Sequence, residues 1–364
     1  STADCRPPTA DSSKMRILHL AAGNRWTGAA APAFAEVEAL RAAGVDAHYA
    51  YVGGYKLQAK LAHHDFAHPI IEKAQNPLSF GRTLETLERM IEHHGFDIIH
   101  AHLTYDHWLA RFASRGRDIR IARTFHARRV LRTDPFSRSL LRRTDLTFVV
   151  NEAFADAPAL QGRSVVFTPP PIDLVQFSPD GGDARALQGI DAQTKLVTVI
   201  GKLSAGRGFE EALQTFAVLR RSLHTARMMI IGHGEHRPAL ELLAKSLAIE
   251  DDVIWAGYHE DDLADHYRAS DLLLFTARGS DEGHRAVLEA MACGVPVATY
   301  PIEGIGALVA PEWIAQAADP EALAALAANL LARDPAALRS ESAERSQEFG
   351  YNRAAERLIR AYGE

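Results

Sequence analysis

The stretch DEGHRAVLEAMACGVPV, residues 281–297, decides the fold of this chain. An apolar run at residues 271–275 precedes it and reads as the end of a buried strand. Residues 279–283 then predict a loop, and residues 285–292 predict a helix that a glycine and a proline bring to an end. In an open parallel sheet, ligands bind at the carboxyl ends of the strands, where the free N–H groups of a helix start attract phosphate oxygens. The stretch therefore predicts an α/β fold with an anion site after this strand.

Two acids in this stretch, Asp281 and Glu289, have seven residues between them. That spacing resembles the retaining family-4 glycosyltransferases of the GT-B fold, whose second acid opens the pattern Glu-Ala-Met-Ala-x-Gly-x-Pro-Val. Residues 289–297 match this pattern residue for residue. The family usually has Glu-Gly-Phe-Gly at the first acid, so two alignments are open: Asp281 without a gap, or Glu282 with one residue deleted. We favour Asp281, because a lipopolysaccharide-type branch of the family carries Asp-Gly-Thr-Cys-Arg-Ala there, which puts Arg285 in register.

A second motif follows the β-rich run at residues 195–200. The resembled family has Gly-Arg, a short spacer and then Lys-Gly at this place, and the two cations hold the donor diphosphate. This chain exchanges them, with Lys202 after Gly201 and Arg207 before Gly208. The charge is kept, because Arg binds phosphate with bidentate geometry and Lys binds it as a point charge. By the resemblance, Gly201, Lys202 and Arg207 contact the donor.

A third strand runs into a Gly-x-Gly turn at Gly232. A dinucleotide-binding fingerprint needs one more glycine, and Arg237 holds that position, so a nicotinamide-binding interpretation fails. The resemblance instead places Gly232 on the nucleotide side of a donor site, and it adds Gly283, His284 and Arg285 to the residues that bind the donor.

The first half of the chain repeats the pattern of strands that end in polar residues. A strand at residues 16–20 leads into a loop with Thr27 and Gly28, which opens an alanine-rich helix. Later strands end in His102 and His126. The resemblance puts both histidines at an interdomain cleft, with His126 nearest the transferred sugar. It puts Thr27 and His102 on the acceptor side, and Gly28 near the donor.

The chain has 17 histidines, which raises the possibility of a metal site. His100, His102, Asp106 and His107 superficially match the His-x-His-x-Asp-His string of zinc hydrolases. The spacing is wrong by two residues, and alternation along a strand puts His100 and His102 on one face without placing Asp106 beside them. We therefore expect no metal site.

A length of 364 residues suggests two domains. We expect a disordered tail at residues 1–14, an acceptor-binding domain at 15–172, a nucleotide-sugar-binding domain at 173–345 and a C-terminal helix at 346–364 that packs back towards the first domain. Three prolines at residues 169–171 stiffen the junction. A net charge of -6 argues against a nucleic-acid partner. Two cysteines, with neither a leader nor an 18-residue uncharged run visible, favour a cytoplasmic protein.

The resemblance implies two Rossmann-like parallel-sheet domains facing a central cleft. It also implies transfer of a sugar, with retention, from a nucleotide diphosphate-sugar to an acceptor hydroxyl. Lys202 and Arg207 would neutralise the departing diphosphate. Glu289 would hold ribose hydroxyls, and Asp281 or Glu282 would hold hydroxyls of the donor sugar. The leaving phosphate accepts the proton in this scheme, so neither a protein nucleophile nor a metal or other cofactor is required.

Residues 111–143 hold eleven arginines and only two acidic residues. Phe136, Leu140 and Leu141 interleave with them, so residues 134–143 could form an amphipathic helix on an anionic membrane or receive a phosphorylated lipid acceptor. We expect peripheral association with the cytoplasmic face of the inner membrane. The acceptor would be lipid-linked or a saccharide, in lipopolysaccharide, glycolipid or envelope polysaccharide synthesis. The alternative is a solvated arginine face.

Two functions of other classes remain open. A non-catalytic partner subunit with a decayed donor site would explain the irregular first acid, and it would bind nucleotide without turnover. A zinc hydrolase built on the histidines would contain bound zinc.

Overall fold

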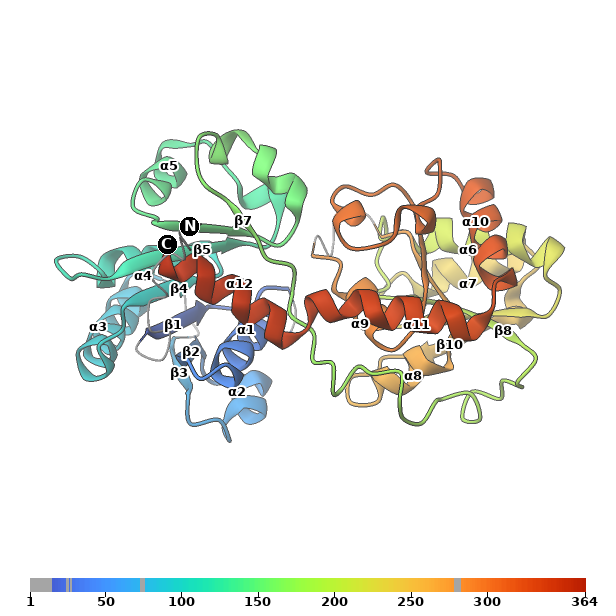
Figure 1. Ribbon diagram of the computed structural model, residues 1–364, viewed down its shortest axis with the longest axis horizontal. Coiled ribbons are helices and arrows are strands. Elements are labelled where there is room, and N and C mark those ends of the chain that lie inside the picture. The colour runs from blue at the N-terminus through green and yellow to red at the C-terminus, as the bar shows by residue number, and fades with distance from the viewer. Residues whose placement is uncertain (1–14, 24–25, 27, 73–75, 278–282) are drawn as a thin grey trace, which may run out of the picture. The chain divides into compact units, whose positions relative to one another are not determined.

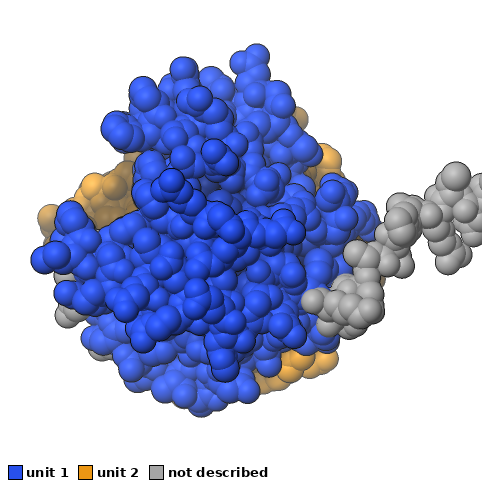
Figure 2. All heavy atoms as spheres, turned by 90° about the vertical axis from the view of Figure 1, so that its left-hand side faces the viewer, with its two compact units in different colours: residues 1–171, 349–364 blue, residues 172–348 orange. Residues whose placement is uncertain are grey.

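The computed structural model describes residues 15–23, 26, 28–72, 76–277 and 283–364. The chain divides into two compact units (Figure 2): Ser1–Pro171 with Phe349–Glu364, called here the N-terminal unit, and Ile172–Glu348, called the C-terminal unit. Each unit contains one sheet in which all the paired strands are parallel. The predicted fold class, with two parallel-sheet α/β domains, is confirmed.

The sheet of the N-terminal unit has seven strands in the order β3-β2-β1-β4-β5-β6-β7 (Figure 1). The strands come from the first half of the chain, and most of their buried residues are apolar, as is typical of parallel strands buried on both faces. His19, His100 and Arg123 are buried polar residues among them. The strands are β1 (Arg16–Ala21), β2 (Asp46–Val52), β3 (Ala67–Ile71), β4 (Ile98–Ala101), β5 (Arg120–Phe125), β6 (Leu146–Val149) and β7 (Val166–Phe167).

Helices cover both faces of this sheet. On one face, α1 and α12 pack against each other and share a buried cluster that includes Val37, Leu40 and Leu358 (Figure 1). On the other face, α3 and α4 share a cluster that includes Leu87 and Leu109. The helices are α1 (Ala30–Ala42), α2 (Lys56–Leu61), α3 (Pro77–His94), α4 (Thr104–Ala113), α5 (Pro135–Leu141) and α12 (Tyr351–Gly363), with short 3-10 turns at Arg128–Val130, Glu152–Asp156 and Pro158–Leu160.

The sheet of the C-terminal unit has five strands in the order β10-β9-β8-β11-β12. They are β8 (Lys195–Ile200), β9 (Ala226–Ile231), β10 (Val253–Gly257), β11 (Leu272–Phe275) and β12 (Val297–Thr299). Helix α6 packs against α10, while α9 packs against α8 and α11. The helices are α6 (Phe209–Ser222), α7 (Arg237–Ser246), α8 (Leu263–Ala269), α9 (Arg285–Ala292), α10 (Pro320–Ala332) and α11 (Pro335–Ser346), with 3-10 turns at Glu250–Asp252, Ile305–Ala307, Pro311–Trp313 and Gln347–Phe349.

Local sequence explains where several helices begin and end. Asn76 caps α3 by accepting a hydrogen bond from the backbone of Ser79, and Gly95 closes the helix in the left-handed region at φ 66°. The side chains of Asp319 and Asp334 cap α10 and α11, and a proline follows each cap. These positions hold the residue types that satisfy free N–H groups at a helix start.

The arginine-rich segment differs from its expected form. Helix α5 spans Pro135–Leu141, and its Leu140 and Leu141 are buried in the protein, while Phe136 is exposed. Arg123, part of the same basic run, is also buried. Two of the three apolar residues expected on a membrane therefore pack inside the N-terminal unit. Within the part of the chain that the structure describes, no helix is both long and apolar enough to span a bilayer.

Candidate functional site

Glycines bring three strand ends of the C-terminal unit unusually close together. Gly232, at φ 140°, follows β9, and a Cβ on it would lie 1.9 Å from the carbonyl oxygen of Gly201, which follows β8. Gly208, at φ 83°, approaches the loop after β11, where a Cβ would lie 2.3 Å from the carbonyl oxygen of Thr276. The hydroxyl of Thr276 donates to the carbonyl of Gly208 at 2.6 Å. Only glycine allows this packing at the carboxyl edge of the sheet.

Two cations flank the loop that joins β8 to α6. The Lys202 ammonium lies 3.8 Å from the carboxylate of Glu235, and both side chains are largely exposed. A pair of this kind is weak, so Lys202 can turn to another anion. Arg207 is half-buried directly before Gly208, and α6 begins at Phe209. The loop therefore combines two cations with the N–H groups of a helix start, a combination that suits phosphate oxygens.

Glu289 lies on α9 with both carboxylate oxygens engaged. Its Oε1 forms an ion pair of 2.7 Å with Arg285 one turn earlier, and its Oε2 accepts a hydrogen bond of 3.2 Å from the hydroxyl of Tyr267. Burial raises the pKa of Tyr267 well above its usual range, and the neighbouring Glu289 charge adds to this. These two contacts hold the Glu289 carboxylate in a defined orientation on α9.

The turn into α9 is ordered by His284. This residue has φ 50°, in the left-handed region, and its Nε2 donates to the carbonyl of Glu303 at 3.2 Å. Its Nδ1 is buried and has no hydrogen-bond partner among the described residues. Gly283 is buried beside it. Asp281 and Glu282 lie outside the described residues, so the two alignments of the first acid both stay predictions.

The expected acceptor-side residues lie in the N-terminal unit. His102 and His126 contact each other, with His102 Nδ1 3.0 Å from His126 Nε2. His102 is buried and His126 is half-buried. Gly28 is exposed at φ 63°, and a Cβ there would meet nothing within 4 Å, so the described residues show no close backbone approach at this glycine. Thr27 lies outside the described residues.

The zinc-hydrolase string is divided by the fold. Asp106 accepts hydrogen bonds from the backbone N–H groups of Ala22 at 2.8 Å and Leu103 at 2.7 Å. The bond from Leu103 lies at the start of α4 and caps this helix. Burial raises the pKa of Asp106 to about 6. His107 Nε2 lies 2.8 Å from the hydroxyl of Thr144. Neither residue joins His100 and His102, so the four do not form one ligand set.

Sequence reasoning missed three residues that surround His100 and His102. His19 on β1 pairs in register with His100 on β4, Glu36 reaches them from α1, and Tyr362 reaches them from α12. All three are buried. The sequence offered a signal for His19. It is the fourth residue of a largely apolar strand, as His100 is the third residue of another, and both strands belong to the same sheet. Nothing local pointed to Glu36 or Tyr362.

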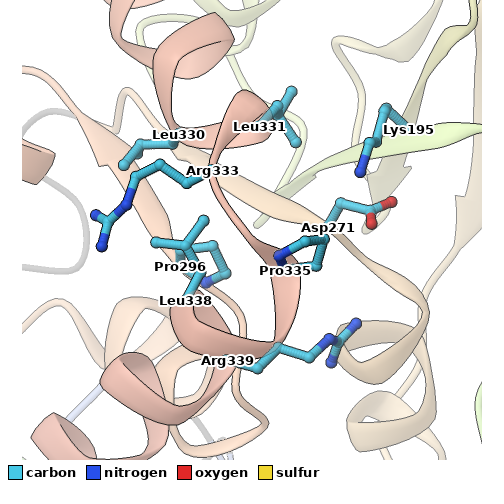
Figure 3. A pocket seen from close by; sticks show the side chains of 9 residues that line it. All are labelled: Lys195, Asp271, Pro296, Leu330, Leu331, Arg333, Pro335, Leu338 and Arg339. Carbon is cyan, nitrogen blue, oxygen red and sulfur yellow. The ribbon is translucent and has the colours of Figure 1, made fainter.

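A small hollow elsewhere in the C-terminal unit does not belong to the donor site. Lys195, Asp271 and Pro296 line it, at the starts of β8, β11 and β12 (Figure 3). Its volume of about 20 Å³ holds about one water molecule. Lys202 and Arg207 follow the other end of β8, where ligands of open parallel sheets bind.

Two protein families match the chain. The family described as "Glycosyl transferases group 1" matches residues 182–353, and "Glycosyltransferase Family 4" matches residues 26–176. Among curated relatives, N-acetyl-alpha-D-glucosaminyl L-malate synthase of Bacillus anthracis is 24% identical over 76% of this chain and 76% of that protein. D-inositol 3-phosphate glycosyltransferase of Segniliparus rotundus is 28% identical over 56% of this chain. The chain covers only 48% of the length of that relative and 32% of mannosylfructose-phosphate synthase of Agrobacterium fabrum.

Solved structures share the whole fold. Anabaena HepE in complex with UDP superposes with a TM-score of 0.78 at 18% identity, covering 96% of this chain and 99% of that chain. The lipopolysaccharide outer core galactosyltransferase WaaB superposes with a TM-score of 0.71 at 13% identity, covering 96% of this chain and 99% of that chain. The chain thus belongs to the group 1 and family 4 glycosyltransferases and has their GT-B fold.

Proposed function

We propose that this protein transfers a sugar from a nucleotide diphosphate-sugar to an acceptor hydroxyl, with retention of configuration and without a metal. One observation carries the proposal: Lys202 and Arg207 flank a glycine-lined loop at the start of α6, at the carboxyl edge of the sheet in the C-terminal unit. Cations at this place stabilise the charge that develops on a departing diphosphate. A UDP complex of the similarly folded HepE supports a nucleotide donor.

The remaining site residues have proposed roles in the same scheme. Glu289 holds ribose hydroxyls, because Arg285 and Tyr267 fix its carboxylate in a defined orientation and a carboxylate accepts hydrogen bonds from hydroxyl groups. Asp281 or Glu282 holds hydroxyls of the donor sugar. His126 contacts the transferred sugar or the acceptor. Side-chain cations replace a metal ion in neutralising the leaving group, so no metal ligand is assigned.

The activity is tested in two steps. A thermal-shift screen of UDP, GDP, ADP and their common sugars identifies the base, because a ligand specific for the native state raises the melting temperature by mass action. Release of the nucleoside diphosphate from the stabilising sugar nucleotide is then followed in excess EDTA. Release that persists in EDTA supports a metal-independent transferase. Stabilisation without any release, across saccharide and lipid acceptors, would instead support a non-catalytic partner subunit.

The acceptor is proposed to be lipid-linked or a saccharide of the cell envelope. Attachment to an anionic membrane is supported by four exposed side chains, those of Arg138, Arg142, Arg143 and Phe136. The two leucines of α5 are buried, so the attachment would depend on the charges of the arginines and on insertion of Phe136 alone. Each basic residue near such a surface contributes about 1 kcal/mol.

Sedimentation with anionic liposomes tests the membrane contact. Binding at low salt should fall as salt is added, because counterions screen the arginines. It should also fall when Arg138, Arg142 and Arg143 are changed to Gln. Absence of binding at low salt would remove the membrane proposal and leave the transferase proposal intact.

A further inference from the structure

Six side chains of the N-terminal unit form one hydrogen-bonded chain that ends at His126. The hydroxyl of Thr124 lies 2.7 Å from His100 Nε2, and His100 Nδ1 lies 2.6 Å from the hydroxyl of Tyr362. That hydroxyl lies 3.4 Å from His19 Nε2. His19 Nδ1 lies 2.9 Å from His102 Nε2, and His102 Nδ1 lies 3.0 Å from His126 Nε2. We call this set the histidine relay; its inner members are buried.

The two contacts between imidazoles are hydrogen bonds rather than halves of a metal site. Ring centroids of His19 and His102 are 5.2 Å apart while their facing nitrogens are 2.9 Å apart, so the rings lie end to end. His102 and His126 repeat this geometry, with centroids 5.3 Å apart and nitrogens 3.0 Å apart. A metal requires both lone pairs to point at one shared ion. In each of these two contacts, the lone pair of one nitrogen points at the N–H of the facing ring.

Burial favours the neutral form of the imidazoles in the relay. Burial lowers the pKa of His19 and of His126 to about 3, and that of His100 and of His102 well below its usual range. The charged groups that face the relay agree with this. Arg123 on β5 lowers the pKa of three of these histidines further. Glu36 on α1 has its Oε2 3.6 Å from His19 Nδ1, and burial raises its own pKa to about 8, which favours its protonated, neutral form near pH 7.

A neutral imidazole has one N–H and one acceptor nitrogen, so protons along the relay must run head to tail in one of two directions. The short contact at Tyr362 selects between them. A distance of 2.6 Å is below the usual range of about 2.7–3.2 Å for N–H donors and within that of about 2.5–3.0 Å for O–H donors. This distance favours Tyr362 as the donor to His100. The oxygen of Tyr362 then faces the N–H of His19 Nε2 at 3.4 Å, a longer and weaker contact.

This direction determines every proton up to the end of the relay. His19 Nδ1 must accept from His102 Nε2, and His102 Nδ1 must accept from His126 Nε2. The remaining nitrogen, Nδ1 of His126, then carries a lone pair, and no described residue donates a hydrogen bond to it. We propose that Tyr362 is a positioning residue that holds the proton of His126 on Nε2, so that Nδ1 of His126 accepts a hydrogen bond from a hydroxyl of the substrate. The substrate part rests on the proposed transferase function; the proton position does not.

The test reads the proton position directly. In protein labelled with nitrogen-15 histidine, long-range proton–nitrogen correlation spectra at pH 7.5 distinguish protonated from unprotonated ring nitrogens, and the signals of His126 are those lost in His126→Gln. We expect an unprotonated Nδ1 and a protonated Nε2. In Tyr362→Phe, a proton on His19 Nε2 would face a ring without an acceptor, so the direction reverses and the proton of His126 moves to Nδ1.

Tyr49→Phe is the matched control. Tyr49 is buried in the same apolar cluster as Tyr362, and its hydroxyl donates to the carbonyl of Ala30 at 3.0 Å, outside the relay. It should leave the signals of His126 unchanged. A His126 that is protonated on Nδ1 or charged in the unaltered protein, or that keeps its Nε2 proton in Tyr362→Phe, would overturn the proposal. If the spectra agree but no nucleotide sugar binds or reacts, the transferase function fails and the relay stands. If a nucleotide sugar reacts but the spectra disagree, the relay fails and the transferase function stands.

Discussion

The proposed donor site contains a side chain that its neighbours hold in place, Glu289, and one that can reorient, Lys202. Glu289 is fixed by Arg285 and Tyr267, whereas Lys202 is 54% exposed and forms a long, weak ion pair with Glu235. A fixed carboxylate suits neutral hydroxyls of defined geometry. A mobile ammonium suits a charged diphosphate, because a point charge tolerates several orientations.

Lys202→Ala or Arg207→Ala should therefore lower the kcat/KM for the donor by roughly 10²- to 10³-fold, the scale for losing one preorganised electrostatic donor. Melting temperature should change little, since neither side chain is buried. Lys195→Ala is the control, because Lys195 begins the same strand at its other end. An unchanged kcat/KM for the donor in both variants would show that these cations do not bind the diphosphate.

The first acid of the motif is tested by a pair of isosteric changes. Asp281→Asn should reduce kcat/KM for the sugar donor more than Glu282→Gln does, because the ungapped alignment directs only Asp281 at the sugar hydroxyls. Steady-state kinetics with the identified donor measure both. The reverse order would support the alignment with one residue deleted.

At the scale of elements, the site depends on strand ends that touch through glycine. Gly232→Ala should destabilise the C-terminal unit by roughly 3 kcal/mol, because its Cβ would lie 1.9 Å from the backbone of Gly201 and its φ of 140° disfavours any side chain. Thermal unfolding with and without nucleotide measures this. Gly81→Ala in α3, where a Cβ meets nothing within 4 Å, should be neutral or stabilise by up to about 1 kcal/mol. Equal stability of the two variants would contradict the account.

Elements were predictable from sequence where the signals are local. The expected helix at residues 285–292 coincides with α9, since a buried apolar face and a following Gly-x-Pro define it. The expected strand at 16–20 is β1 to within one residue. Burial of Leu140, Leu141 and Arg123 was not predictable, because it depends on packing between elements. Leu141, for example, packs in one cluster with Phe125 and Val149. An amphipathic pattern shows which face of α5 is apolar, not whether protein or membrane covers it.

The whole molecule brings together residues that no local pattern connects. Tyr362 contacts His100 across 262 residues of sequence and His19 across 343. The result is a buried group of neutral histidines in the N-terminal unit, and such a group has a consequence for stability. Histidines buried without charge favour the unfolded state once that state can take up protons.

Stability should fall steeply as the pH falls below about 6.5. Burial lowers the folded-state pKa of nine described histidines, among them His19, His100, His102, His107 and His126, so below about 6.5 the unfolded chain binds more protons. Each contributes up to about 1.4 kcal/mol per pH unit. Two buried carboxyl groups oppose this. The raised pKa of Glu36, about 8, makes the folded state gain stability as pH falls from about 8 towards 4.5, and that of Asp106, about 6, does so as pH falls from about 6 towards 3.8. Melting temperatures between pH 8 and 5 measure the balance.

His107→Gln is the control for this prediction, because Gln keeps a polar partner for Thr144 without titrating. It should remove the contribution of one histidine from the dependence of stability on pH. A melting temperature that stays constant or rises between pH 7 and 5 would show that the buried histidines do not govern acid unfolding.

The most direct test of the central claim is calorimetric titration of a nucleoside, its monophosphate and its diphosphate, with the base chosen by thermal shift. Lys202 and Arg207 should bind the terminal phosphate, and hydrogen bonds to charged groups contribute about 1.5–3 kcal/mol each. The diphosphate should therefore bind roughly 10- to 100-fold more tightly than the monophosphate, and Arg207→Ala should abolish most of that difference. Equal affinity of the monophosphate and the diphosphate, or no nucleotide binding for any base, would contradict the account.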